Sequence, residues 1–387
     1  MPEPTLAPQL DKILSPVIEA RATTDQPSDE VGLCLSGGGY RAMLFHVGVL
    51  WRLNEMGWLP KLSRIASVSG GSITAGVLGL SWNELAFVRG VAVNFKEKIV
   101  GPLRQMAGTS LDVSSVLVGA LLPGVTASDR VAKQYSKVLF GDATLQDLPD
   151  SPSFIFCATN VQTGSLVRFA KKRFADWQVG CVDAPTIPLA KAVTASSAFP
   201  PVLSPCEIKL PAGAMQSLPG AEFFRPPFTT DLILSDGGVY DNLGIEPVWK
   251  NCATVLVSDA GQKISAEEEP AEDWGRHVMR VLDLIDNQVR ALRKRQVVGS
   301  FTAGLRKGAY WGIRTDIADY QLLTALPCPH SVTLAIAATP TRLTALDEGA
   351  QQKLINWGYA VCDAAMRKHV DTGATAPAAF PYPDGVG

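Results

Sequence analysis

Two short segments contain residues that could hold an anion and attack a carbonyl carbon. The first, CLSGGGYRAML (34–44), places Gly37, Gly38 and Gly39 just before a cation, Arg41. Three consecutive glycines favour unusual backbone dihedral angles or a very close approach to another group. Backbone N–H groups at the beginning of a helix can bind an anion or a developing oxyanion. The glycine spacing fits neither nucleotide-binding loop pattern, so a phosphate loop is disfavoured.

The second segment, IASVSGGSITAG (65–76), has the pattern of a nucleophile elbow. Ser69 follows an apolar run, Ser67 stands two positions before it, and Gly70 and Gly71 come directly after it. A sharp strand-to-helix turn exposes a serine Oγ, and it leaves room only for small residues two positions away. Ser69 is therefore a candidate nucleophile, and a helix N-cap is its alternative role.

A nucleophilic serine needs a base, and the sequence offers two kinds. Asp236 in LILSDGGVYDNLG (232–244) follows an apolar run and precedes two glycines. Its carboxylate is expected at the same sheet edge as Ser69, although an Asp-Gly turn is the alternative. Three of the histidines follow Ser69 in the chain order of a Ser-His-acid triad, whereas the first lies within a predicted helix. The four are His46, His277, His330 and His369.

The elements around these candidates alternate between short apolar runs and helical periodicity, which predicts a parallel α/β sheet. The expected strands are 31–35, 64–68, 153–158, 165–168, 232–234, 254–258 and 332–335. The expected helices are 42–56, one beginning near 71, and 348–369. Residues 210–227 are rich in Pro, Gly and Ala and predict a long surface loop.

The composition is that of a globular protein with a large core: 387 residues, 47% hydrophobic and 19% charged. A formal charge of −2 gives no reason to expect nucleic acid. Seven cysteines without a C-x-x-C pair indicate a reducing compartment and no zinc pattern. The first residues lack a secretory pattern, and the most apolar stretch, 73–93, is interrupted by charges. We therefore expect a cytoplasmic protein without a transmembrane helix.

Taken together, the three motifs resemble those of the patatin-like phospholipase family: G-G-G-x-[RK]-G, G-x-S-x-G and D-G-[GA]. Residues 37–41, 67–71 and 236–238 match them in the same order, and the likeness extends over about residues 31–262. Ala42 replaces the last glycine of the first motif, and Ser67 replaces the first glycine of the second. Both replacements are small, so we expect the site to remain active.

The resemblance implies a three-layer α/β/α fold with a mainly parallel central sheet. It implies that Ser69 is the nucleophile, that Asp236 is the base, and that residues 37–39 hold the oxyanion. Arg41 then either complements a charge or braces the loop. No metal or organic cofactor is implied. The four expected regions are an N-terminal segment (1–30), the catalytic core (31–262), a mainly helical part packed on it (263–371) and a loose tail (372–387).

The implied substrate is a membrane phospholipid or another acyl ester, reached by transient binding to a membrane surface. Two segments are candidates for that contact: the apolar residues 111–125, and residues 276–307, with eight basic side chains against Asp283 and Asp286. The basic segment could also meet a small phosphate-bearing activator. A Ser-His-acid esterase and a non-hydrolytic protein that binds a nucleotide or an anionic membrane remain open as alternatives. The sequence gives no signal for an oligomeric state.

Overall fold

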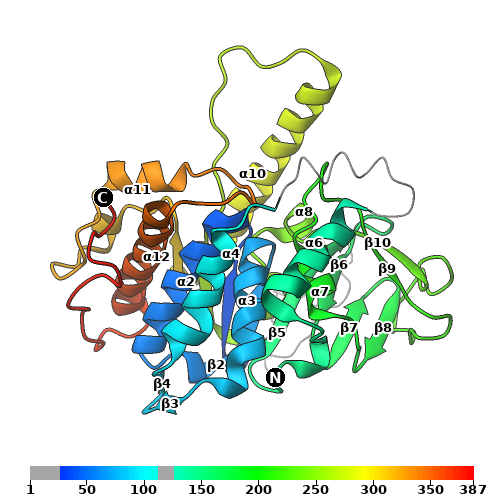
Figure 1. Cartoon of the computed structure of the whole chain (residues 1–387), viewed down its shortest axis with the longest axis horizontal. Coiled ribbons are helices and arrows are strands. Elements are labelled where there is room, and N and C mark those ends of the chain that lie inside the picture. Colours follow the sequence, from blue (N-terminus) through cyan, green and yellow to red (C-terminus); the bar gives the residue numbers. More distant parts are fainter. Residues whose placement is uncertain (1–26, 112–125) are drawn as a thin grey trace, which may run out of the picture.

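A ten-stranded sheet forms the centre of the chain, whose computed structural model describes residues 27–111 and 126–387 (Figure 1). Its order is β12-β11-β1-β2-β5-β6-β7-β8, and β10 pairs with both β5 and β9. The strands are β1 (Ser28–Leu35), β2 (Leu62–Ser67), β5 (Ser153–Asn160), β6 (Leu166–Phe169), β7 (Arg173–Asp176), β8 (Gly180–Asp183), β9 (Cys206–Lys209), β10 (Asp231–Asp236), β11 (Cys252–Asp259) and β12 (Lys307–Gly312). A separate hairpin joins β3 (Phe87–Val88) and β4 (Val91–Ala92).

Helices cover both faces of this sheet. They are α2 (Gly39–Glu55), α3 (Gly70–Ser81), α4 (Gly101–Ala107), α6 (Ala127–Tyr135), α7 (Leu189–Ser196), α8 (Gly238–Asp241), α9 (Glu246–Trp249), α10 (Trp274–Thr302), α11 (His330–Ala337) and α12 (Glu348–His369). Short 3-10 and π turns lie at 59–61, 82–84, 96–100, 136–140, 145–147 and 317–320. None of the helices in the described ranges is long and apolar enough to span a bilayer.

The five strands from β12 to β5 are parallel, and the hairpins beyond them are antiparallel. Parallel strands end at one edge, so the chain leaves β1 and β2 side by side at the edge where motif residues follow both strands. The expected α/β/α fold with a mainly parallel central sheet is confirmed. Residues 210–227 contain no helix or strand, as expected for a long loop.

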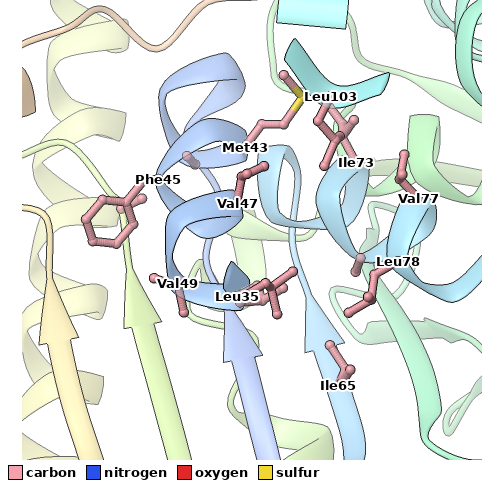
Figure 2. Packing of buried hydrophobic residues seen from close by; sticks show 14 of the residues in the cluster. Leu35, Met43, Phe45, Val47, Val49, Ile65, Ile73, Val77, Leu78 and Leu103 are labelled. Carbon is pink, nitrogen blue, oxygen red and sulfur yellow. The ribbon is translucent and has the colours of Figure 1, made fainter. Parts of the chain in front are cut away.

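Alternating side chains on the strands build two separate cores. Leu33 and Leu35 of β1 face the larger core beneath α2, α3 and α12, whereas Cys34 faces a smaller one. Figure 2 shows Leu35, Ile65 and side chains of α2 and α3 packed in the larger core. Residues 243–248 and the C-terminal part of α10, through Val297, cover the smaller core. The result is a buried sheet whose carboxyl edge is held rigidly.

Two expectations from the sequence are wrong. Residues 332–335 belong to helix α11, not to a strand, because a four-residue apolar run does not distinguish a strand from a buried helix face. The tail after residue 371 is not loose. Tyr382 and Val386 are buried, and Asn356 Nδ2 of α12 donates to the carbonyls of Tyr382 and Gly385 at 2.9 and 2.7 Å. Hydrogen bonds from Asn356 to backbone carbonyls thus hold a segment whose composition is typical of a linker.

Helices α2 and α12 pack backbone to backbone. A β-carbon on Gly48 of α2 would overlap the carbonyl of Ile355, and one on Gly358 of α12 would overlap the carbonyl of Phe45. Neither neighbour is a flexible side chain that could move aside. These two glycines therefore allow the close approach by which α12 covers α2 beside the catalytic motifs.

We expect the Gly358→Ala substitution to lower the free energy of unfolding by about 1–3 kcal/mol or more, because the added methyl group forces the two helices apart. Gly299→Ala in α10 is the matched control: no atom lies within 4 Å of its would-be β-carbon. Removing a helical glycine there should stabilise the protein by up to about 1 kcal/mol. Urea unfolding of both variants tests this, and equal stabilities would contradict the packing argument.

Candidate active site

Ser69 occupies a strained turn between β2 and α3. Its backbone angles are φ 51° and ψ −119°, a conformation that non-glycine residues rarely adopt. The side chain is 8% exposed, and the residue stands at the N-cap of α3. Such a turn directs the serine Oγ outward at the positive end of a helix, as a nucleophile elbow does.

The glycine loop and the elbow press their backbones together. A β-carbon on Gly70 would overlap the carbonyl of Gly39, and one on Gly71 would overlap the carbonyl of Leu35. A β-carbon on Gly37 would lie 3.1 Å from the β-carbon of Ser69. The two glycines after Ser69 are thus required by the close approach of Gly39 and of the end of β1, and this contact brings Ser69 directly beside the glycine loop.

Three N–H groups at this junction are free to bind an oxyanion. The N–H of Gly37 donates to the carbonyl of Asn242 at 3.1 Å, so this residue contributes its small size rather than a donor. Among the described residues, the N–H groups of Gly38, Gly39 and Gly70 donate no hydrogen bond. Of the expected donors 37–39, Gly37 is thus already engaged, Gly38 and Gly39 stay available, and Gly70 after Ser69 offers a third free N–H group.

Arg41 lies fully buried behind the glycine loop. Its Nε and Nη2 donate to the carbonyl of Ala260 at 3.1 and 3.0 Å, and Nη1 donates to the carbonyl of Thr339 at 2.6 Å. Burial lowers the pKa of Arg41 to about 10, which leaves it charged at neutral pH. Arg41 thus braces the loop through carbonyls rather than through an ion pair, and its charge adds to the positive field there.

Asp236 is tied to the elbow by one backbone carbonyl. The carbonyl of Ser196, the last residue of α7, accepts from the N–H of Ser69 at 3.1 Å and from the N–H of Gly237 at 3.3 Å. The N–H of Asp236 itself donates to the carbonyl of Ala198 at 2.9 Å. The end of α7 thereby holds the serine turn and the Asp-Gly turn in one fixed relation.

Asp236 is 2% exposed, and only one of its carboxyl oxygens has a hydrogen-bond partner among the described residues. Oδ1 accepts from the N–H of Gly238 at 2.7 Å, while Oδ2 is buried and meets no hydrogen-bond geometry among the described residues. Burial raises the pKa of Asp236 from its ordinary value of 3.8 to about 7, although Gly238 and the nearby Ser69 hydroxyl oppose the shift. The group is therefore poised to exchange a proton near neutral pH.

A chain of buried hydroxyls supports the elbow from behind. Ser72 Oγ donates to Ser67 Oγ at 2.9 Å and lies 2.8 Å from Ser196 Oγ, which accepts from the N–H of Ser69 at 3.1 Å. The hydroxyl of Ser67, which stands where the family motif has glycine, thus has a hydrogen-bond partner in Ser72. No pattern in the sequence signals the role of Ser196.

No histidine forms a hydrogen bond with Ser69 or Asp236 in the described part of the chain. His46 is buried: its Nε2 donates to the carbonyl of Ser36 and its Nδ1 accepts from Ser258 Oγ, each at 2.9 Å. Burial lowers the pKa of His46 to about 4, so it is neutral and structural. His277 is exposed on α10, and the other two histidines line a cavity beside β12.

Of the two candidate segments for membrane contact, the structure describes the basic one and only the first residue of the apolar one. Residues 112–125 lie outside the described residues. On α10, several basic side chains are already engaged: Arg276 pairs with Asp273, Arg280 with Glu267 and Arg293 with Glu246.

The described residues contain no group of three or more His, Cys, Asp or Glu side chains that could hold a metal ion.

Comparison with solved structures supports the fold. Human GIVD cytosolic phospholipase A2 superimposes with a TM-score of 0.52 at 12% identity, covering 94% of this chain and 61% of that one. The same enzyme in complex with methyl gamma-linolenyl fluorophosphonate gives a TM-score of 0.51 at 15% identity, covering 93% and 60%. The chain thus spans about three fifths of the human enzyme, and identities this low show the fold alone.

Comparison of sequences identifies the family. An alignment of 81 residues is 40% identical to phospholipase B of Cryptococcus neoformans var. grubii, covering 17% of this chain and 13% of the fungal protein. Residues 33–249, more than half of the chain, match the family described as Patatin-like phospholipase. This match includes the glycine loop, the elbow and the Asp-Gly turn. The chain therefore belongs to the patatin-like phospholipase family.

Proposed function

We propose that the protein is a lipid acyl hydrolase that cleaves carboxylic esters of membrane lipids through an acyl-enzyme on Ser69. One observation carries the proposal: the strained serine turn lies against the glycine loop, and the Ser196 carbonyl ties it to the turn that contains Asp236. A nucleophile, a base and free N–H donors are thereby assembled at one sheet edge. Family membership and the likeness to phospholipases support the same chemistry.

In the proposed reaction, Ser69 Oγ attacks the acyl carbonyl carbon while Asp236 accepts the hydroxyl proton. The carbonyl oxygen becomes an oxyanion, which the N–H groups of Gly38, Gly39 and Gly70 stabilise. Each such donor is typically worth about 2.7–4 kcal/mol. Collapse of the tetrahedral intermediate breaks the ester bond, and the proton passes from Asp236 to the leaving alcohol. Water, deprotonated by Asp236, then releases the fatty acid and regenerates Ser69.

Ser69 and Asp236 form the proposed catalytic dyad, so each should be essential and the two should act as one unit. We expect Ser69→Ala and Asp236→Asn each to lower kcat/KM for a soluble short-chain ester by about 10⁴-fold or more, and the double variant to lose little further. His277→Gln, on the exposed side of α10, is the control and should keep wild-type activity. Substantial hydrolysis by either folded dyad variant would contradict the assignment.

The buried carboxyl of Asp236 predicts a rise in activity with pH. The base must be ionised to accept the serine proton, and its pKa is about 7, so kcat/KM should rise through about pH 7 and level off above it. In the unfolded chain the pKa of Asp236 is near its ordinary value of 3.8. Because the folded pKa is higher, the free energy of unfolding of wild type should fall relative to that of Asp236→Asn as the pH rises from about 3.8 to about 7. A flat rate profile from pH 5 to 8 would oppose this role.

We also propose that α10 contacts the lipid surface. Figure 1 shows α10 and the loop before it projecting beyond the rest of the chain. This helix carries eight of the eighteen exposed large hydrophobic residues in the described part, so no other element offers a comparable apolar surface. They are Trp274, Val278, Val281, Leu282, Leu284, Ile285, Leu292 and Val298. Because many of its basic residues are paired locally, the contact should depend more on these side chains than on charge.

The double variant Val281→Asp and Ile285→Asp should bind phosphatidylcholine vesicles at least about tenfold more weakly, because full burial of each apolar side chain is worth about 1.5–3 kcal/mol. Leu323→Asp, which replaces a fully exposed leucine away from α10, is the matched control. Co-sedimentation measures binding, and hydrolysis of a soluble ester confirms that the site is intact. Equal binding of all three proteins would remove α10 from the membrane contact.

A further inference from the structure

A cavity of about 460 Å³ lies at the same sheet edge as the dyad, next to the end of β12. In the order of the sheet, β12 is three strands away from β2, which carries Ser69. Side chains from four elements line it: Lys294 of α10, Arg314 after β12, His330 at the start of α11 and His369 at the end of α12. The mechanism of ester hydrolysis uses none of these residues.

The two permanent cations of this cavity have no carboxylate partner. Neither Lys294 nor Arg314 takes part in any ion pair of the described residues. The ammonium group of Lys294 lies over the ring of Tyr310, 4.7 Å from its centroid, and Arg314 is exposed and forms no hydrogen bond in the described part of the chain. Their neighbour Arg293 on α10 pairs with Glu246. Neither cation is held by a direct ion pair, so both can contact an anionic ligand, although Asp316 and Asp319 also line the cavity.

Two histidines, His330 and His369, also line the cavity. His330 Nδ1 is buried and has no hydrogen-bond partner among the described residues, so it can donate to or accept from a bound group. The ring of His369 meets Tyr320 edge to face, with centroids 5.9 Å apart. Of the two carboxylates in the lining, that of Asp316 caps the turn at 317–320 by accepting from the N–H of Ala318, while Asp319 is exposed.

These groups match a phosphate better than a carboxylate. Arginine presents a fork of N–H donors that fits two phosphate oxygens, and lysine supplies a point charge for a third. The volume exceeds that of a phosphate ion, so the remainder of a larger molecule can occupy it. We propose that this cavity binds the phosphate group of a small phosphorylated ligand through Lys294, Arg314 and His330.

Isothermal titration of the full chain with inorganic pyrophosphate at pH 6.5 tests this proposal. Wild type should bind one equivalent, and Lys294→Gln and Arg314→Gln should each weaken binding at least about tenfold. Arg295→Gln, an exposed neighbour of Lys294 that is absent from the cavity lining, is the matched control and should bind as wild type does. Thermal unfolding confirms that each variant is folded. Absence of saturable binding to wild type, or equal affinities of all variants, would overturn the proposal.

The phosphate could belong to a soluble molecule or to a lipid headgroup, and a second arm separates the two. Vesicles of phosphatidylcholine with phosphatidylglycerol are sedimented with wild type and with the Lys294→Gln/Arg314→Gln variant. Weaker sedimentation of the variant assigns the site to a headgroup, and equal sedimentation, with pyrophosphate binding lost, assigns it to a soluble ligand. The titration does not depend on ester hydrolysis, so its outcome is separate from that of the proposed function.

Discussion

The site depends on the direct contact between two stretches of backbone, the glycine loop after β1 and the serine turn after β2. At this contact no β-carbon fits on Gly70 or Gly71, because the carbonyls of the other stretch occupy the space. Parallel strands leave the sheet side by side, so the two turns meet at its edge. A β-carbon on Gly37 would lie 3.1 Å from the β-carbon of Ser69, so the strained serine turn packs directly on the glycine loop. A larger residue at the junction would force apart the proposed nucleophile and the proposed donors.

The second constraint is the fixed relation between the serine and the aspartate, which come from distant parts of the sequence. The carbonyl of Ser196 accepts an N–H from each turn, and its hydroxyl belongs to a hydrogen-bonded chain that runs through Ser72 to Ser67. The same packing removes Asp236 from water and raises its pKa toward neutrality. Rigidity and basicity of the dyad thus have a common physical origin in the close packing of α7 against the sheet edge.

The sequence predicted those parts of the site that depend on local backbone geometry. Glycines beside Ser69 and Asp236 mark positions where the backbone of another segment leaves no room for a β-carbon. Helix α12 was predicted with its observed bounds because its apolar spacing is long and regular. No local sequence pattern predicts contacts between residues that are distant in the chain. The carbonyl partners of Arg41, the role of Ser196 and the packing of the tail depend on tertiary neighbours. Likewise, the basic residues of α10 were candidates for contact with an anionic group, but Arg280 and Arg293 pair with acids that only the fold brings near.

The most direct test of the account is to identify the residue that a fluorophosphonate labels. Such a probe reacts with a serine only where a base and oxyanion donors activate it. After incubation of the full chain with a fluorophosphonate, intact mass and peptide mapping should show one adduct per chain, on Ser69, and its formation should slow strongly in Asp236→Asn. An adduct on a different serine, or none on folded wild-type protein, would contradict the account.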